Sequence, residues 1–259
     1  MKIISLNQKN IEQEHICCAI VDKKNQEGVR LKKEWLKARF QEGLTFRKLD
    51  VRGKIFIEYL PAEYAWRPVN APGYLFIHCL WVSGKYKGQG YAKELLNYCI
   101  ADAEGTNGIA VVTSKKPFLT DKGFFLKHGF EVCDTAPPYF ELLVRKNTDA
   151  PPPVFTESAK SLTTPNQNGI QIFYSDQCPF LNYYIDEMAK VAEEYGIPVQ
   201  ATKLHTAAEA QSMTTAYGTF NVFYNGKFLT HMPMSQKGFQ KALEGIKPQK
   251  VKGAMLHNK

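Results

Sequence analysis

The chain has 259 residues, a length that favours two compact domains over one. Hydrophobic residues make up 44% and charged residues 22%, with 18 Gly and 14 Pro, so a disordered chain, a collagen-like rod and a coiled coil are excluded. The longest apolar stretch, Tyr74 to Val82, is far shorter than the ~20 residues that span a bilayer, and the first residues lack the apolar core of a secretory signal. We therefore expect a globular cytoplasmic protein with no membrane partner.

The formal net charge of +8 is concentrated in the first part of the chain. Residues 1–146 hold 23 Lys and Arg against 16 Asp and Glu, whereas the remainder holds 10 against 9. A basic domain attracts nucleic acid or a small polyanion such as a phosphorylated cofactor, or it only aids solubility. No nucleic-acid-binding motif is present, so we expect no nucleic-acid partner. The six cysteines show no CxxC pair and no metal-ligand spacing, so we expect no metal site.

The hydrophobic pattern predicts strands and helices in alternation up to residue 146. The polar turn Asp50–Gly53 joins two strands of a hairpin, and Tyr74–Val82, apolar on both faces except for His78, suits a buried central strand. The predicted strands are Lys2–Leu6, Leu44–Leu49, Lys54–Leu60, Tyr74–Val82, Ile109–Thr113, Glu131–Cys133 and Tyr139–Val144. The predicted helices are Asn10–Ile20, Glu27–Gln41, Gly90–Ala103 and Thr120–His128, the last with Thr120 as its cap.

Residues 147–169 carry four prolines and many small polar residues, which predicts an interdomain linker. The expected domains are therefore 1–146 and 170–259. In the second domain a strand, a helix and a strand are followed by a hairpin around Asn225-Gly226. Its predicted strands are Ile170–Tyr174, Pro198–Leu204, Phe220–Tyr224 and Lys227–Thr230, and its predicted helices are Leu181–Tyr195, Ala207–Tyr217 and Phe239–Leu243.

A glycine-rich turn, Lys87 to Ala92, joins the predicted central strand to an amphipathic helix. Glycines let the backbone approach a ligand, and the unpaired amides and positive dipole end of a helix start bind phosphate groups. Neither GxGxxG with a distal acidic residue nor GxxxxGK[ST] is present, which disfavours NAD and ATP. A glycine-rich turn between a strand and a helix that binds no ligand is the competing interpretation.

The turn resembles motif A of the GNAT N-acetyltransferases, Arg/Gln-x-x-Gly-x-Gly/Ala, here Lys87-x-x-Gly90-x-Ala92, and the order of elements in residues 1–146 is that of the family. Phe124–Phe130 is similar to the later helix-to-strand signature of the family. The resemblance implies transfer of an acetyl group from acetyl-CoA to an amine on a small molecule or peptide. The implied cofactor-binding residues are Leu80, Trp81 and Val82 beside the pantetheine arm and Lys87, Gly88, Gln89, Gly90, Tyr91 and Ala92 at the pyrophosphate.

Acetyl transfer requires a neutral amine, a polarised thioester carbonyl and a proton for the departing thiolate. A backbone N–H near Leu80 or Trp81 would polarise the carbonyl. His78, expected on the same face of its strand as Leu80, is the candidate base, and a buried histidine without a catalytic role is the competing interpretation. Phe125 stands where family members carry a tyrosine acid, so water, Tyr139 or another group donates the proton, or the thiolate leaves unassisted, or the domain binds acyl-CoA without fast turnover.

Acids and aromatic residues follow the first hairpin, from Glu58 to Arg67. Glu58, Glu63 and Trp66 are candidates for the acceptor side of the site, because carboxylates among aromatic rings can hold a cationic amine. An ordinary hairpin rim is the competing interpretation.

The second domain, with YSDQCP at its first helix and GTFNVFYNGKFLT in its hairpin, resembles a thioredoxin or glutaredoxin fold. Cys178 at a helix N-terminus is the candidate reactive thiol, with a lowered pKa expected from the helix dipole. The second cysteine of the active pair is Leu181 here and the usual proline is Gly218, which disfavours dithiol exchange. Monothiol chemistry and a docking role both stay open.

Over nearly its whole length, with the segments EYAWRP, HCLWV and SDQCPF, the chain resembles GNAT acetyltransferases that carry a C-terminal YoaP-like domain. The expected fold class is α/β (α+β), a GNAT acyltransferase fold followed by a smaller thioredoxin-like domain. The expected function is N-acetyl transfer from acetyl-CoA. The alternative is a thiol-based redox or electrophile-sensing protein that uses Cys178 and an acyl-CoA-binding first domain. The acceptor and the oligomeric state do not follow from the sequence.

Overall fold

The computed structural model describes residues 2–16 and 23–246, and the fold is mixed α/β as predicted. Its strands are β1 (Ile3–Leu6), β2 (Thr45–Leu49), β3 (Ile55–Pro61), β4 (Val69–Asn70), β5 (Tyr74–Val82), β6 (Gly108–Ser114), β7 (Glu131–Ala136), β8 (Phe140–Lys146), β9 (Val154–Phe155), β10 (Ile170–Tyr174), β11 (Val199–Lys203), β12 (Phe220–Tyr224) and β13 (Lys227–Thr230). Its α-helices are α1 (Gln26–Phe40), α2 (Tyr91–Asp102), α3 (Lys122–Leu126), α4 (Leu181–Glu194), α5 (Ala207–Gln211) and α6 (Gln236–Gly245). Short 3-10 turns are η2 (Lys23–Asn25), η3 (Ala62–Tyr64), η4 (Gly84–Tyr86) and η5 (Ser158–Lys160).

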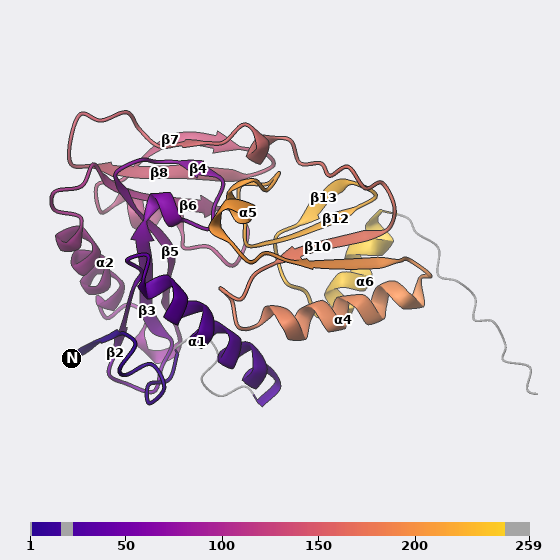
Figure 1. Ribbon diagram of the computed structural model, residues 1–259, viewed down its shortest axis with the longest axis horizontal. Helices are drawn as coiled ribbons and strands as arrows, with labels where there is room; N and C mark the ends of the chain where they lie inside the picture. Colours follow the sequence, from indigo (N-terminus) through magenta and orange to yellow (C-terminus); the bar gives the residue numbers. More distant parts are fainter. Residues whose placement is uncertain (1, 17–22, 247–259) are drawn as a thin grey trace, which may run out of the picture.

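The first part of the chain forms a seven-stranded sheet in the order β1-β2-β3-β5-β6-β8-β7 (Figure 1). All neighbouring strands are antiparallel except the central pair β5 and β6. One face of the sheet packs against Trp35 and Leu36 of α1, and the other packs against Leu95 and Leu96 of α2. The apolar stripes of these two helices therefore cover opposite faces of the sheet, as amphipathic helices do.

The parallel pair β5 and β6 separates halfway along its length. Its register runs only from Tyr74 opposite Gly108 to Ile77 opposite Val111, although both strands continue. Beyond Ile77, β5 is paired on its β3 side alone. The sheet therefore opens between β5 and β6 at the carboxyl end of β5.

A β-bulge on β5 corrects one sequence expectation. Cys79 lies opposite Glu58 and Ile77 lies opposite Tyr59, so His78 is the extra residue in the register. An extra residue interrupts the alternation of side chains between the two faces of a sheet. His78 packs beside the Phe76 ring, while Leu80 packs in the cluster on the opposite face. The prediction that His78 and Leu80 share a face is wrong for this reason.

The last part of the chain forms a second sheet in the order β11-β10-β12-β13. β10 and β11 are parallel, and the pairs β10–β12 and β12–β13 are antiparallel. The amphipathic helices α4 and α6 pack against each other, and both bury apolar residues against this sheet (Figure 1). The predicted strand–helix–strand unit and hairpin are confirmed.

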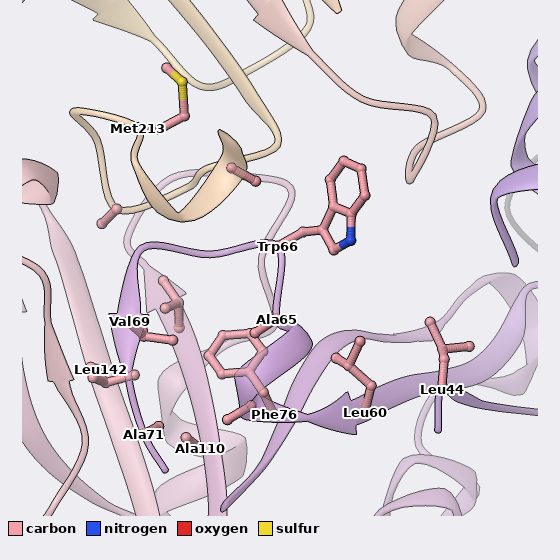
Figure 2. Packing of buried hydrophobic residues seen from close by; sticks show 14 of the residues in the cluster. Leu44, Leu60, Ala65, Trp66, Val69, Ala71, Phe76, Ala110, Leu142 and Met213 are labelled. Atoms are coloured by element: carbon pink, nitrogen blue, oxygen red, sulfur yellow. The ribbon is translucent and has the colours of Figure 1, made fainter. Parts of the chain in front are cut away.

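The segment 147–169, predicted as a linker, is packed between the two sheets. Its strand β9 pairs with β4 of the first part, and Thr163 bridges to Lys227 of β13. Phe155 and Ala159 are buried in the same hydrophobic cluster as residues of both sheets. Figure 2 shows part of this cluster, in which Met213 from the segment after α5 joins residues of the first part such as Val69. A continuous hydrophobic core therefore connects the two sheets.

Two glycines allow the two parts of the chain to touch through their backbones. A Cβ atom at Gly28 in α1 would lie 1.9 Å from the carbonyl oxygen of Pro179, which precedes α4. A Cβ atom at Gly218, whose φ is +73°, would lie 2.6 Å from the carbonyl oxygen of Trp66. Real Cβ atoms do not approach that closely, so only glycine fits either position. The glycine that replaces the usual proline before β12 thus makes room for the first part of the chain.

Three predicted helices differ from the structure. Residues 10–14 form turns rather than a helix because the Asn7 and Asn10 side chains bond nearby backbone groups, and residues 17–20 of that prediction lie outside the described residues. The cap of α3 is Asp121 rather than Thr120. α5 ends at Gln211, since the residues after it bond β12 and the 147–169 segment.

Candidate active site

A cavity of about 490 Å³ lies where β5 ends and α2 begins, and we call it the groove. α2 starts after Gly90, whose φ of +84° is readily adopted only by glycine. No side chain caps this helix end, and the first bond inside the helix runs from the Glu94 N–H to the Gly90 carbonyl oxygen. The groove therefore receives the positive end of the α2 dipole.

Most of the predicted cofactor-binding residues line the groove: Leu80, Trp81, Val82, Lys87, Gly88, Gly90, Tyr91 and Ala92. Gln89 does not, because its side-chain amide turns back and donates to the Lys85 carbonyl oxygen at 2.5 Å. The backbone N–H of Lys87 is bonded to the Gly84 carbonyl oxygen, so the amides that can face a ligand begin at Gly88. A cofactor held here would therefore meet one backbone amide fewer than the motif suggests.

The residues of the groove fit the phosphates of acetyl-CoA. Gly88 and Gly90 have positive φ angles, and a Cβ built on either glycine meets no atom within 4 Å, so the backbone there is open to a ligand. Lys87 and Lys93 line the same cavity and supply positive charge. Open backbone, a helix start and lysines together form an anion-binding site.

The backbone N–H of Leu80 points into the opening between β5 and β6. Ser83 donates its N–H to Lys54 on the β3 side, while the Thr120 hydroxyl donates to the Leu80 carbonyl oxygen at 2.8 Å on the other side. Because the N–H and C=O of one strand residue point the same way and successive residues alternate, the Leu80 N–H faces away from β3. Leu80 rather than Trp81 thus offers a donor to a group in the opening.

A second cavity, of about 330 Å³, lies between the two parts of the chain, and we call it the interdomain cavity. Its lining residues from the first part are Lys54, Phe56, Glu58, Arg67, His78, Cys79, Trp81 and Phe118, and those from the second part are Gln177, Cys178, Phe180, Tyr184 and Tyr217. Residues from β3 and β5 thus face residues from the loop before α4 and the segment before β12. Neither part of the chain forms this cavity alone.

A small cavity of about 10 Å³, which we call the opening, lies between the two cavities and shares lining residues with each of them. It lies in the gap between β5 and β6 and is lined by residues of both strands and of the loop before α3. His78, Cys79 and Phe118 are shared with the interdomain cavity, and Leu80, Leu119 and Thr120 are shared with the groove. Trp81, which is 41% exposed, lines all three. A group in the groove and a group in the interdomain cavity can therefore meet beside Trp81.

A buried ionic network forms the floor of the interdomain cavity. Lys32 of α1 bonds Glu58 Oε2 at 2.5 Å, and both side chains are at most 1% exposed. Glu58 Oε1 accepts from Gln177 Nε2 at 3.1 Å and from His78 Nδ1 at 3.3 Å. Burial alone would raise the pKa of Glu58, but the Lys32 ammonium and the His78 bond outweigh it and lower that pKa to about 2. Glu58 is therefore an ionised group whose oxygens are already bound.

His78 has both ring nitrogens engaged within the protein. The Trp66 backbone N–H donates to His78 Nε2 at 3.0 Å, so the proton sits on Nδ1, which faces Glu58. Burial lowers the pKa of His78 to about 4. The ring lines the interdomain cavity but leaves no lone pair for an incoming amine. This geometry corresponds to the competing interpretation of a buried histidine whose hydrogen bonds are satisfied.

The three acceptor-side candidates separate in the structure. Glu58 lines the interdomain cavity. Glu63, in η3, accepts a bond from the Gly73 N–H at 2.7 Å and does not line the cavity. The Trp66 side chain is 1% exposed and belongs to the hydrophobic core (Figure 2). Its backbone N–H, rather than its ring, bonds a residue that lines the cavity, His78. Of the three predicted side chains, only that of Glu58 lines the interdomain cavity.

Cys178 does not show the predicted lowered pKa. Burial raises the pKa of its thiol, and a bond from the Phe180 backbone offsets only part of that rise. Burial likewise raises the pKa of Cys79, on the opposite wall of the cavity, to about 12. The helix-dipole argument failed because it ignored the first part of the chain, whose Gly28 lies against Pro179 just before α4. Both thiols stay protonated at neutral pH, which does not favour thiol chemistry.

The residues considered for proton donation lie away from the opening. Phe125 is fully buried beneath α2. The Tyr139 hydroxyl bonds His231 Nδ1 at 2.9 Å, and His231 Nε2 bonds the Pro117 carbonyl oxygen at 3.3 Å. Burial raises the pKa of Tyr139 to about 12. Tyr139 therefore ties the loop before α3 to the second part of the chain, and it lines neither cavity.

Sequence reasoning assigned no functional role to four residues that the structure brings to or beneath the interdomain cavity: Lys32, Arg67, Gln177 and Tyr217. One signal existed, because Lys32 falls on the buried face of α1 with Gly28 and Trp35, and Glu58 is the lone charged residue of β3. A charged residue on a core-facing position of a helix predicts a buried ion pair. Gln177 and Tyr217 carry no such signal.

Comparison with known proteins agrees with this geometry. The family model for the GNAT acetyltransferase domain matches residues 51–132, and the model described as YoaP-like matches residues 198–241. The uncharacterized N-acetyltransferase YoaP of Bacillus subtilis (strain 168) is 46% identical over 251 residues, which cover 95% of this chain and 100% of that protein. The chain belongs to the YoaP family of GNAT N-acetyltransferases. Its activity is acetyl transfer from acetyl-CoA to an amine, and the redox and electrophile-sensing alternative is not supported.

Solved structures of acetyltransferases were also found that cover more than half of the chain. The PaiA N-acetyltransferase of Thermoplasma acidophilum in complex with coenzyme A is 19% identical, covers 56% of this chain and 99% of its own, and has a TM-score of 0.39. The aminoglycoside 6'-N-acetyltransferase of Enterococcus faecium is 14% identical, covers 59% of this chain and 100% of its own, and has a TM-score of 0.41. No helix within the described ranges 2–16 and 23–246 could cross a membrane, and no cluster of three metal-ligating side chains occurs there.

Proposed function

We propose that acetyl-CoA binds in the groove and that the amine acceptor enters through the interdomain cavity, so that the two react in the opening between β5 and β6. The observation that carries this proposal is the shared wall: Trp81 lines both cavities and the opening between them. An enzyme that joins two substrates gains most of its rate from holding the reacting atoms side by side.

Three steps follow from the residues at hand. The Leu80 N–H donates to the thioester carbonyl oxygen and stabilises the oxyanion that forms when the amine attacks. The ammonium group of the acceptor must first release a proton to water, and the Lys54 cation that lines the cavity lowers the pKa of an ammonium group held there. The amine nitrogen bonds the acetyl carbon and the carbon–sulfur bond breaks. The proton that the nitrogen loses as it becomes an amide reaches the sulfur through water, so CoA leaves as the thiol.

We also propose that residues 1–146 and 170–259 are the two domains, that the second is of the thioredoxin type, and that it serves to build the acceptor wall. Its strand order β11-β10-β12-β13, with one parallel pair and α4 directly after β10, supports the fold assignment. Five lining residues of the interdomain cavity come from it, which supports the role. The raised pKa of Cys178 argues for packing rather than for exchange chemistry.

Isothermal titration with acetyl-CoA tests the groove, using a matched pair of glycine variants. Gly90 and Gly105 have φ angles of +84° and +81°, and a Cβ on either meets no atom within 4 Å. Alanine in such a conformation costs about 1 kcal/mol at both positions, but only Gly90 lines the groove. We expect Gly90→Ala to weaken acetyl-CoA binding at least tenfold and Gly105→Ala to leave the affinity unchanged. Equal affinities for the two variants would remove the groove from the proposal.

Release of free CoA in the presence of candidate amines tests the acceptor side. Substitution of Trp81 by alanine opens the shared wall, so we expect kcat/KM for the acceptor to fall about 100-fold, since misplacement of reacting groups by an ångström has effects of that order. The Kd of acetyl-CoA should change far less. A Trp81→Ala enzyme with wild-type kcat/KM would contradict the proposed meeting point.

A further inference from the structure

Arg67 is a buried cation without an acidic partner in the part of the chain that the structure describes. It is 2% exposed, and its ordinary charge state is positive. Its Nη1 donates to three neutral acceptors, the Trp66 carbonyl oxygen at 2.9 Å, Gln177 Oε1 at 3.2 Å and Thr219 Oγ1 at 2.8 Å. Nη2 and Nε make none of these bonds. The guanidinium also stacks on the Tyr217 ring at 4.5 Å and lines the interdomain cavity.

The nearby carboxylate does not neutralise Arg67. The Glu58 oxygens are bound by Lys32, Gln177 and His78, and Lys32 already balances the Glu58 charge. His78 is neutral, so this buried cluster of Lys32, Glu58 and Arg67 has a net charge of +1. Burying an unpaired charge costs several kcal/mol, so proteins keep such groups where something else balances them. The cavity that Arg67 lines is the place where a balancing anion can enter.

A purely structural role does not account for the charge. The three bonds of Nη1 tie the segment after η3 to the loop before α4 and to the residue before β12. A neutral amide could donate to such acceptors without the cost of a buried cation. Burial also lowers the pKa of Arg67, which shows that its surroundings disfavour the positive charge. The structural role therefore leaves the unbalanced positive charge beside the interdomain cavity unexplained.

We propose that the acceptor is an amino acid or another amino carboxylate, whose carboxylate is bound by Arg67 while its amine reaches the opening beside Trp81. This inference rests on the proposed function. A planar carboxylate matches the fork of a guanidinium, and its single negative charge balances the net charge of the buried cluster. The aromatic side chains of Phe56, Phe118 and Tyr217 also line the cavity, so they can contact the apolar carbons that join the amine of the acceptor to its carboxylate. The cavity of about 330 Å³ suits a small acceptor of this kind.

The test measures binding of product mimics to the full-length chain saturated with CoA. The probes are N-acetylglycine, N-acetyl-β-alanine, N-acetyl-γ-aminobutyrate and N-acetylphenylalanine, each beside its neutral primary amide and its phosphonate analogue. We expect at least one carboxylate to bind saturably, and to bind at least tenfold more tightly than its amide and its phosphonate. The proposal is overturned if no carboxylate binds up to millimolar concentration, if amides bind equally well, or if a phosphonate binds best.

Variants assign the preference to Arg67. We expect Arg67→Gln to reduce the carboxylate-to-amide ratio of affinities to about one, and Arg67→Lys to keep a reduced preference because its charge stays. Thr219→Val removes one of the Arg67 bonds but no charge, so its ratio should stay near that of the wild type. A wild-type ratio in Arg67→Gln would overturn the assignment.

Binding of acetyl-CoA separates the possible failures. It reports folding of each variant, because none of the altered residues lines the groove. If Arg67→Gln does not fold, the comparison of carboxylate with amide on the wild-type chain and on Arg67→Lys still decides. Loss of acetyl-CoA binding by the wild-type chain would instead contradict the proposed function. Intact acetyl-CoA binding without carboxylate preference contradicts this inference alone.

Discussion

The groove and the interdomain cavity are built in opposite ways. All residues that line the groove come from two stretches of the first domain, residues 80–93 and 119–124. The interdomain cavity draws on residues from Lys54 to Tyr217, and five of them come from the second domain. A site that binds the same cofactor through backbone groups can be formed by one strand, one turn and one helix. A wall that selects an acceptor is assembled from distant side chains, so a second domain can change it without disturbing the groove.

The two regions also differ in how they carry charge. Lys87 stands at the open groove, exposed to water. The floor of the interdomain cavity contains Lys32, Glu58 and Arg67, each at most 2% exposed. Exposed charges contribute little to stability, whereas buried ones are costly to leave unpaired. We therefore expect substitutions at the cavity floor to affect folding and substitutions at the groove to affect binding.

The largest expected effect is on the buried pair of Lys32 and Glu58. Glu58→Gln leaves a buried ammonium without its carboxylate and should lower the free energy of unfolding by about 3 to 5 kcal/mol. Glu14→Gln is the matched control, because Lys48 is 1% exposed but its partner Glu14 is 26% exposed, so water can replace the lost carboxylate. Urea unfolding at pH 7 measures both. Equal losses for the two variants would show that removing the carboxylate from the fully buried pair costs no more stability than removing it from the partly exposed pair.

The contact between the domains gives the next effect. Gly218→Ala places a Cβ 2.6 Å from the Trp66 carbonyl oxygen at a φ of +73°, so strain and overpacking together should lower stability by about 2 to 4 kcal/mol. Gly105→Ala, with similar φ and open space, should lose about 1 kcal/mol. Calorimetric unfolding should show a single transition in the wild type, because one core joins the sheets. Separate transitions for the two domains would contradict that coupling.

The free energy of unfolding should also decrease as the pH falls, because two histidines are buried. Burial lowers the pKa values of His78 and His231 to about 4, below the ordinary value of 6.5. Between those values the unfolded chain binds protons that the folded chain does not, so each histidine should remove about 1.4 kcal/mol per pH unit as pH falls from 6.5 toward 4. His231→Gln should halve this slope. A stability that is flat between pH 6.5 and 4.5 would contradict the burial of both rings.

The smallest effect is expected at the groove. Lys87→Gln removes one exposed charge beside the bound phosphates and should weaken acetyl-CoA binding about threefold at low salt, with less difference at high salt. Lys237→Gln, which removes an exposed lysine of α6, is the control and should leave the affinity unchanged. Titrations at two ionic strengths make the measurement. If Lys87→Gln loses a hundredfold or more, the side chain rather than the backbone holds the phosphates.

The sequence was informative wherever structure follows from neighbouring residues. Hydrophobic periodicity located β5 and α2, and the glycine turn between them is where the groove lies. Side-chain details were less predictable even there, since Gln89 turns away and the bulge at His78 shifts its side chain to the other face. A side chain that bonds its own loop, or an extra residue in a strand, does not change the hydrophobic periodicity of the sequence, so neither can be predicted from it.

The interdomain cavity could not be predicted from single segments. Arg67 and Gln177 are separated by 110 residues in the chain, and their contact depends on how the second domain docks. The expected lowered pKa of Cys178 failed for the same reason, because burial by the first domain outweighs the helix dipole. Gly218 was recognised as a departure from proline, but its reason, the close approach of the Trp66 backbone, exists only in the folded chain.

A crystal structure of this chain with acetyl-CoA bound would most directly test the central claim, that acetyl-CoA binds in the groove with its acetyl group at the opening between β5 and β6. The account predicts the pyrophosphate on the backbone of Gly88 to Ala92, the thioester oxygen within hydrogen-bonding distance of the Leu80 N–H, and the acetyl methyl group beside Trp81, facing the interdomain cavity. An acetyl group that points away from the opening between β5 and β6, or a pyrophosphate bound elsewhere, would contradict it.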